Sequence, residues 1–304
     1  MAARAEAAAY RCDRAALRRS FDRAAASYED AAIVQSQVRE ELLGRLDFVA
    51  MEPRLVVDAG AGTGVSSLAL ARRYPRARIV ALDVSLAMLR AARRRRPPWR
   101  RSGGFDRVCG DLQRLPFADA SVDLLFSNLT LPWCELDEAL AEARRVLAPH
   151  GLFSCTSLGP DTLRELRLAW AQADGGGAHV HHFLDMHDLG DALVRAGFVQ
   201  PVLDVERHTV HYGEFAELVA ALRACGGRNV LAARARGLTG RHKARALREA
   251  YERQRRDGAL PASGEIVFAH AWAGSARAPA AARTDEATIR LEDFARGLRT
   301  RERR

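Results

Sequence analysis

Short apolar runs alternate with amphipathic segments over the first half of the chain. Residues 54–59 form an apolar, β-branched run that predicts a buried strand, and four later runs have the same character. The predicted strands cover residues 54–59, 78–83, 105–109, 121–126 and 152–157, and the predicted helices between them cover 66–74, 85–96 and 136–147. This alternation is typical of a doubly wound α/β fold with a mostly parallel sheet.

The pattern changes on both sides of this core. The N-terminal segment is rich in alanine, with apolar residues at helical spacing. Later segments predict helices at 162–173, 185–196, 214–224 and 241–257 and strands at 201–211 and 265–272. We therefore expect a helical cap (1–50), a core (51–157), the rest of the sheet with helical insertions (158–274), and a mostly disordered tail (275–304).

Composition narrows the class of protein. Hydrophobic residues make up 48% of the 304 positions and charged residues 28%, as in a folded globular domain. No apolar run is long enough to predict a transmembrane helix, and the first twenty residues lack the apolar stretch of a secretory signal, so we expect a cytoplasmic protein. The net charge of +9 comes almost entirely from arginine, which fits either an acidic partner or a compositional bias.

A glycine turn follows the first predicted strand, in the stretch VVDAGAGTG. Asp58 ends the strand, and Gly60, Gly62 and Gly64 precede a helix. Glycines allow a sharp turn and a close approach of the backbone to a ligand, which would lie against the helix N-terminus. The spacing differs from the G-x-G-x-x-G of a dinucleotide-binding dehydrogenase and from the phosphate-binding loop of nucleoside triphosphatases.

Polar side chains also follow the next three predicted strands. Asp83 ends the second strand, where a carboxylate can accept hydrogen bonds from ribose hydroxyls. Asp111 follows the third strand, where it could accept from an adenine amino group, and Asn128 follows the fourth. Because the carboxyl ends of parallel strands meet at one edge, these residues and Asp58 predict a nucleotide-type cofactor site there.

The ordered segments DAGAGTG, LDVS, GDLQRLPF, DLLFSN and RRVLAPHGLF resemble class I S-adenosylmethionine-dependent methyltransferases. The resemblance implies a seven-stranded Rossmann-like sheet whose last strand, here 265–272, is inserted antiparallel. It also implies S-adenosylmethionine as cofactor. The implied cofactor residues are Gly60, Gly62 and Gly64 along its methionine and ribose, Asp83 on the ribose, and Met88, Asp111 and Leu112 around the adenine.

Segments outside this core resemble the malonyl-acyl carrier protein O-methyltransferases of biotin synthesis. They are FDRAAASYEDAAIVQ, NLTLPWC, GPDTLRELRLAW, FLDMHDLGDALVRAGF, RGLTGR and EIVFAHAW, and the resemblance covers about residues 14–274. It implies an N-terminal helical lid and methylation of the free malonyl carboxylate on an acidic carrier protein. The stretch HVHHF, at 179–183, departs from the expected pattern by its extra histidines.

A malonyl carboxylate is ionised at neutral pH, so its methylation needs no general base. It needs a cation to bind the carboxylate and a lid that excludes water and aligns the reacting groups. The aromatic candidates are Tyr28, Trp133 and Phe183, and the arginine candidates are Arg234, Arg236 and Arg241. Candidate docking surfaces for the carrier are Arg93–Arg101 and the helix at 241–256.

The histidine cluster at 179–187 raises the question of a metal, but its spacing favours a polar loop, and we expect no metal site. Two alternatives to carboxyl methylation remain open. One is a protein-arginine hydroxylase or assembly factor on the same fold, which shares the N-terminal helix and glycine motif. The other is an RNA methyltransferase, although no RNA-binding module and no N-P-P-[YF] motif is visible, and nucleic acid is not the expected partner.

Overall fold

The fold is built on one twisted sheet of seven strands. The computed structural model describes residues 11–93, 104–175, 177–235 and 237–274. The strands are β1 (Leu55–Ala59), β2 (Arg78–Asp83), β3 (Asp106–Cys109), β4 (Val122–Ser127), β5 (Leu147–Leu158), β6 (Phe198–Tyr212) and β7 (Leu260–Ala273). Their order is β3-β2-β1-β4-β5-β7-β6, and β7 runs antiparallel to both neighbours. The predicted α/β class and the reversed last strand are confirmed.

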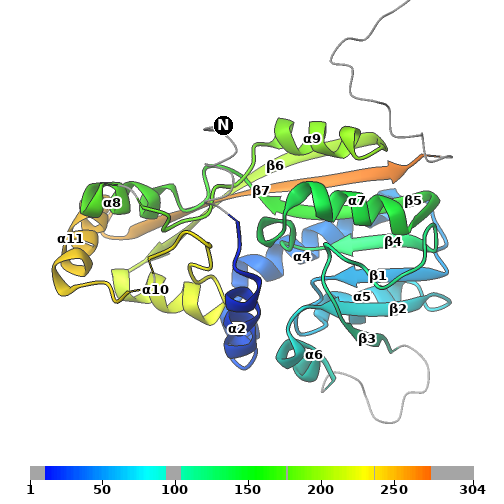
Figure 1. Cartoon of the computed structure of the whole chain (residues 1–304), viewed down its shortest axis with the longest axis horizontal. Coiled ribbons are helices and arrows are strands. Elements are labelled where there is room, and N and C mark those ends of the chain that lie inside the picture. The colour runs from blue at the N-terminus through cyan, green and yellow to red at the C-terminus, as the bar shows by residue number, and fades with distance from the viewer. Residues whose placement is uncertain (1–10, 94–103, 176, 236, 275–304) are drawn as a thin grey trace, which may run out of the picture.

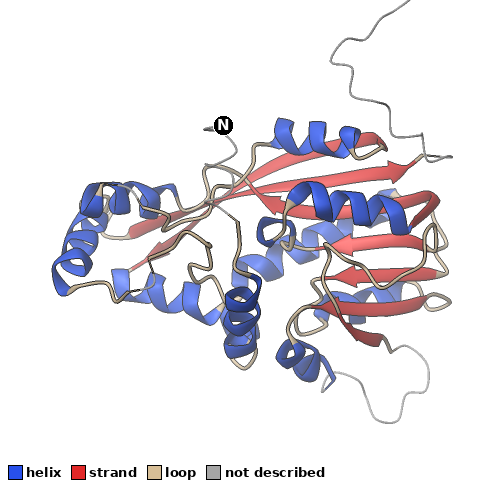
Figure 2. Ribbon diagram, viewed as in Figure 1, coloured by secondary structure: helices blue, strands red, loops and turns tan. Residues whose placement is uncertain are grey.

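Helices cover both faces of the sheet (Figures 1 and 2). The longer ones are α2 (Arg14–Ala24), α4 (Ile33–Arg45), α5 (Val65–Arg73), α6 (Leu86–Arg93), α7 (Leu136–Val146), α8 (Arg164–Asp174), α9 (Met186–Arg195), α10 (Phe215–Ala224) and α11 (Arg241–Glu252). The short ones are α3 (Tyr28–Ala31), η1 (Leu46–Phe48) and η2 (Leu131–Trp133). Apolar residues of α4, α5 and α6 pack on one face, and those of α7 and α9 pack on the other.

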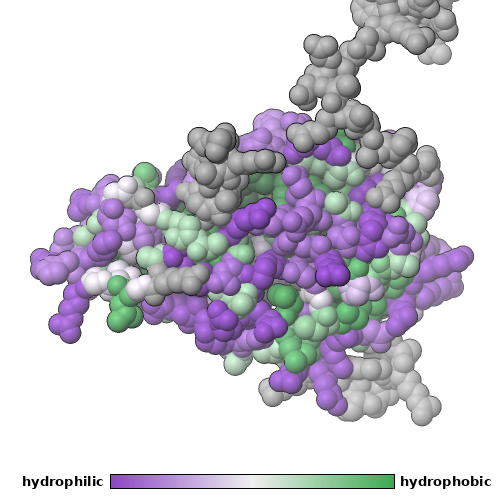
Figure 3. All heavy atoms as spheres, viewed as in Figure 1, coloured by the Kyte–Doolittle hydropathy of each residue, from purple (hydrophilic) through white to green (hydrophobic). Residues whose placement is uncertain are grey.

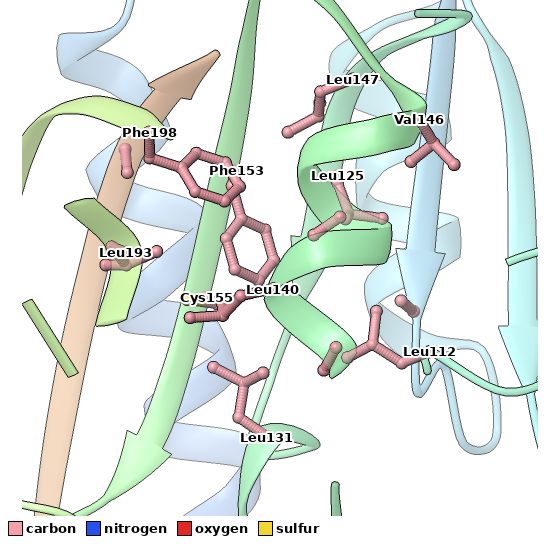
Figure 4. Packing of buried hydrophobic residues seen from close by; sticks show 14 of the residues in the cluster. Leu112, Leu125, Leu131, Leu140, Val146, Leu147, Phe153, Cys155, Leu193 and Phe198 are labelled. Carbon is pink, nitrogen blue, oxygen red and sulfur yellow. The ribbon is translucent and has the colours of Figure 1, made fainter. Parts of the chain in front are cut away.

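Burial on both faces explains why the central strands are apolar along their whole length. In β1, Val57 and Ala59 point into one core and Val56 points into the other, as the two-residue period of a strand requires. Figure 4 shows the first of these cores, where Leu140 of α7 and Leu193 of α9 lie near Phe153 of β5. The sheet is thus a rigid platform whose strand ends can position a site.

A second, smaller lobe forms at the far ends of β6 and β7. These two strands extend beyond the rest of the sheet to α8, α10 and α11 (Figure 1). Tyr251 of α11 is fully buried there, and its hydroxyl donates to the carbonyl of Pro261 at 2.7 Å. Helix α2 lies between this lobe and the sheet, where Leu17 packs against Val230.

Some element boundaries differ from those predicted. The last helix ends at Glu252, not 257, because the N–H groups of Gln254 and Arg255 bond to carbonyls three residues back instead of four. Strand β7 begins at Leu260 rather than 265, since its pairing with β6 continues through the small residues Ser263 and Gly264. The predicted single helical segment at the N-terminus is divided into α2, α3 and α4.

Three of the predicted features lie outside the described residues: most of the arginine run after α6, Arg236, and the tail from residue 275. Within the described part of the chain, no helix is long and apolar enough to cross a membrane. Hydrophilic side chains cover most of the face seen in Figure 3, consistent with the apolar residues being used in the cores.

Candidate active site

One large cavity lies at the carboxyl edge of the parallel strands. Its volume is about 880 Å³, and its walls come from the ends of β1, β2 and β4, from α2, α3 and α4, and from the lobe. Open α/β sheets bind ligands at this edge. Of the predicted cofactor residues, Gly60, Gly62, Asp83, Met88, Asp111, Leu112 and Asn128 all line the cavity.

The three glycines of the turn differ in what surrounds them. A Cβ on Gly60 would lie 1.8 Å from Thr130 Oγ1, and a Cβ on Gly64 would lie 2.7 Å from the Phe105 ring. A Cβ on Gly62 would meet no protein atom within 4 Å, and Gly62 lines the cavity. All three have positive φ. Gly60 and Gly64 therefore permit packing within the protein, whereas Gly62 leaves room for a ligand. Gly64, predicted along the cofactor, does not line the cavity.

Asp83 is held by the backbone at the end of β2. Its carboxylate accepts hydrogen bonds from Gly62 N at 2.8 Å and from Ser85 N at 2.7 Å. Burial raises the pKa of this carboxyl to about 6, against the lowering effect of the two N–H donors. The carboxylate keeps lone pairs beyond these two bonds, so ribose hydroxyls could donate to it from the cavity.

Asp58, also predicted at the cofactor, has another position. It is fully buried beneath the glycine turn, accepts a hydrogen bond from Ser67 Oγ at 2.5 Å, and does not line the cavity. Burial raises its pKa to about 7. The prediction for Asp58 is corrected: this side chain joins β1 to the first turn of α5 and supports the glycine turn from below.

The remaining cofactor candidates form an apolar wall with two polar residues. Met88 and Leu112 are both buried and face the cavity. Asp111 forms an ion pair with Arg14 of α2 and accepts from Gln113 N at 3.1 Å. Asn128 donates to the carbonyl of Gln35 at 3.1 Å and accepts from Thr156 Oγ1 at 2.9 Å, so its amide fastens α4 to the sheet.

The predicted aromatic residues reach the cavity from separate segments. Tyr28, Trp133 and Phe183 all line the cavity. Trp133 packs edge-on against Phe21 and His181, with ring centroids 5.4 and 5.2 Å apart, and His181 stacks on Phe183 at 6.2 Å. Burial raises the pKa of Tyr28, so its hydroxyl stays protonated at neutral pH. The structure thus gathers an aromatic cover over the cavity.

Two of the predicted arginines, Arg234 and Arg241, do not line the cavity. Arg234 pairs with Asp13 at 3.0 Å and donates to the carbonyl of Leu231, and Arg241 is exposed at the start of α11. Among the described residues, the arginines that line the cavity are Arg14 and Arg228. Sequence reasoning missed both, because no local pattern distinguishes one arginine from another in so arginine-rich a chain.

The histidine cluster contributes to the aromatic wall. His181 is buried, its pKa is lowered to about 4 by burial, and its Nε2 has no partner among the described residues. His179 pairs with Asp174 at 2.7 Å and stacks on Trp170 at 3.7 Å. Among the residues that the structure describes, no group of three potential metal ligands is found.

Comparison with known proteins agrees with this geometry. Residues 57–155 match the methyltransferase domain family. A malonyl-acyl-carrier protein O-methyltransferase of Methylovorus sp. is 48% identical, covering 88% of this chain and 92% of that protein. A protein of the same name from Laribacter hongkongensis is 46% identical, covering 88% of this chain and 92% of its own.

Solved structures share the fold at low identity. A putative methyltransferase from Bacillus halodurans superposes with a TM-score of 0.54 at 19% identity, covering 76% of this chain and 98% of its own. The YcgJ protein from Bacillus subtilis superposes with a TM-score of 0.55 at 15% identity, covering 78% of this chain and 100% of its own. Both likenesses concern the fold alone.

Proposed function

This chain belongs to the malonyl-acyl-carrier protein O-methyltransferase family, and from that premise we propose that it esterifies the free carboxylate of a malonyl group carried by an acyl carrier protein. It is an S-adenosylmethionine-dependent O-methyltransferase. The product would be the methyl ester that initiates the pimeloyl chain of biotin. Neither the arginine hydroxylase nor the RNA methyltransferase alternative is favoured by relatives of this name at this identity.

The observation that carries the proposal is one cavity whose lining combines two kinds of surface. One is the open space at Gly62, the backbone-held carboxylate of Asp83 and the apolar surface of Met88, which together fit a nucleoside with a polar ribose and a flat base. The other consists of aromatic side chains, among them Trp133 and Phe183, and helices α2 and α3 also line the cavity. A cofactor and an acyl group could therefore lie in contact within a single enclosed space.

The bound cofactor would supply an electrophilic methyl group on a sulfonium. The protein's part is to align the carboxylate and exclude water, because the acceptor is already ionised. Tyr28, Trp133 and Phe183 would do this by covering the cavity. With its low pKa, His181 stays neutral at physiological pH, so it adds no charge beside the reacting groups.

We assign the carboxylate-binding role to Arg14. It lines the cavity, its Nη1 donates to the carbonyl of Trp133 at 2.7 Å, and its ion pair with Asp111 fixes the guanidinium in place. A fixed cation can orient a carboxylate without long-range rearrangement. Because Asp111 already neutralises part of this charge, the carboxylate would be oriented while keeping its nucleophilic character.

The test is methyl transfer from radiolabelled S-adenosylmethionine to a set of carrier proteins. Malonyl, succinyl, acetyl and unacylated carriers would be compared, with Asp83→Asn as the cofactor-binding control. We expect base-labile label on the malonyl carrier, little on the succinyl carrier, and none on the other two. No transfer to malonyl carrier, by protein shown to bind the cofactor, would contradict the proposal.

A further inference from the structure

Three neighbouring arginines, Arg23, Arg223 and Arg228, form a cluster at the rim of the cavity, which Arg228 lines, and none of them has an acidic partner among the described residues. Elsewhere in the described residues, arginine side chains are commonly paired with carboxylates, as in Arg45 with Asp204 and Glu206, Arg145 with Asp119 and Glu142, and Arg255 with Glu252. Arg23, Arg223 and Arg228 are exposed, and no carboxylate among the described residues forms an ion pair with any of them. Other described arginines, such as Arg76, are also unpaired, but Arg23, Arg223 and Arg228 lie close enough together for their charges to interact.

The local fold brings the three together. Arg23 is in the last turn of α2, Arg223 is in the last turn of α10, and Arg228 follows the turn that ends α10. Ser20 Oγ of α2 donates to the carbonyl of Gly226 at 3.0 Å, and a Cβ on Gly226 would lie 2.7 Å from the Phe21 ring. The two helix ends are therefore closely packed, and Arg228 extends from the junction to line the cavity.

The charges are near enough to repel one another. Partial burial lowers the pKa of Arg228, and the positive charges of Arg23 and Arg223 lower it further. Cations in the last turn of a helix interact favourably with its dipole, which accounts for Arg23 and Arg223. The helix dipole does not account for Arg228, which lies beyond the end of the helix and is repelled by the charges of Arg23 and Arg223. An arrangement that opposes its own charges is typical of a site that binds an anion.

We propose that Arg23, Arg223 and Arg228 bind the phosphodiester of the phosphopantetheine arm on which the carrier protein presents its acyl group. This inference rests on the proposed function. The three arginines come from the ends of two packed helices and the turn that follows one of them, instead of forming a row along one helix, so they fit a compact anion better than a spread of carboxylates. From this rim the arm would continue into the cavity, with its malonyl end at the aromatic wall.

The docking surfaces predicted from the sequence have weaker support. On α11, Arg245 pairs with Glu249 and Arg248 pairs with Glu214, so much of that helix's charge is neutralised. The run after α6 lies largely outside the described residues. The rim cluster combines unpaired charge with direct access to the cavity.

The experiment compares malonyl-phosphopantetheine with malonyl-pantetheine, which lacks the phosphate, as methyl acceptors and as ligands in calorimetry. For the unaltered protein we expect the phosphate to lower KM and Kd about tenfold or more, since hydrogen bonds to charged groups are strong. In the Arg228→Gln variant and in the Arg23→Gln/Arg223→Gln double variant, KM and Kd should become nearly the same for the two ligands. Affinity for S-adenosylmethionine should stay unchanged in every variant.

The matched control is Arg76→Gln, which removes an exposed, unpaired arginine between α5 and β2, at the edge of the sheet remote from the cavity. It should keep the full preference for phosphate. Equal binding of both ligands by the unaltered protein would overturn the inference. So would variants that weaken the binding of malonyl carrier protein but not the binding of free malonyl-phosphopantetheine. That last result would assign the cluster to acidic side chains of the carrier. Phosphate-dependent binding without methyl transfer would support the site and contradict the proposed function.

Discussion

The different surroundings of Gly60 and Gly62 predict that alanine will separate folding from cofactor binding. A non-glycine residue with positive φ costs about 1–2 kcal/mol. At Gly62 that is the whole expected loss of stability, because the new Cβ meets no protein atom within 4 Å. At Gly60 the Cβ also overlaps Thr130, with Oγ1 at 1.8 Å, and overpacking adds about 1–3 kcal/mol.

The expected thermal shifts follow from these free energies. A domain of this size loses about 2–4 °C of Tm per kcal/mol. Gly62→Ala should therefore lower Tm by roughly 2–8 °C and Gly60→Ala by roughly 4–20 °C. The new methyl group at Gly62 projects into the cavity, where overpacking of about 1–3 kcal/mol would weaken cofactor binding about 5- to 150-fold.

The assays are differential scanning calorimetry for Tm and isothermal titration calorimetry with S-adenosylmethionine. Thr130→Ala in the Gly60→Ala background removes two of the overlapping atoms and should recover part of the lost stability. Gly64→Ala should behave like Gly60→Ala, since its Cβ would meet Phe105 and Ala92. Unchanged cofactor affinity in stably folded Gly62→Ala would refute the assignment of that space to the cofactor.

Three further predictions concern charged groups around the cavity. Asp83→Asn should weaken S-adenosylmethionine binding about 10- to 150-fold in calorimetry, and in the unaltered protein affinity should rise from pH 5 to 7, because the Asp83 pKa is about 6 and the ionised form accepts the ribose hydroxyls. The pKa of Asp58 is raised to about 7, so between about pH 4 and 7 this carboxyl stays protonated in the folded protein while it ionises in the unfolded chain. The free energy of unfolding should therefore fall as pH rises through this range. Asp58→Asn should remove that part of the pH dependence in urea titrations. Arg14→Gln should raise KM for malonyl carrier about tenfold or more, with a smaller effect on the affinity for S-adenosylmethionine. Equal weakening of carrier binding and of cofactor binding would indicate a structural role for Arg14. Arg76→Gln serves as the control variant.

The features of the fold and the site that could be predicted from the sequence are those that depend on local patterns of residues. The strands of the core have continuous apolar runs because helices cover both faces, and the positions of Asp83 and Asp111 follow from where those runs end. Tyr28 is predicted through the resemblance and Trp133 from its place after the fourth strand, and both line the cavity although they come from segments far apart in the chain.

What could not be predicted depends on tertiary contacts. Asp58 has the same place at a strand end as Asp83, but its side chain turns toward Ser67 and away from the cavity. Arg234 is tied to Asp13 across more than two hundred positions, which no local spacing signals. The charge cluster around Arg228 likewise exists only because α2 and α10 end at the same point.

We expect one cavity to hold both the cofactor, beside the glycine turn, and the malonyl group, beside Trp133 and Phe183. The most direct measurement is a crystal structure with S-adenosylhomocysteine and malonyl-phosphopantetheine bound together. We expect the ribose hydroxyls on Asp83, the base beside Met88 and the malonyl carboxylate between Arg14 and Trp133. A malonyl group bound outside this cavity, or a nucleoside remote from Asp83, would contradict this expectation.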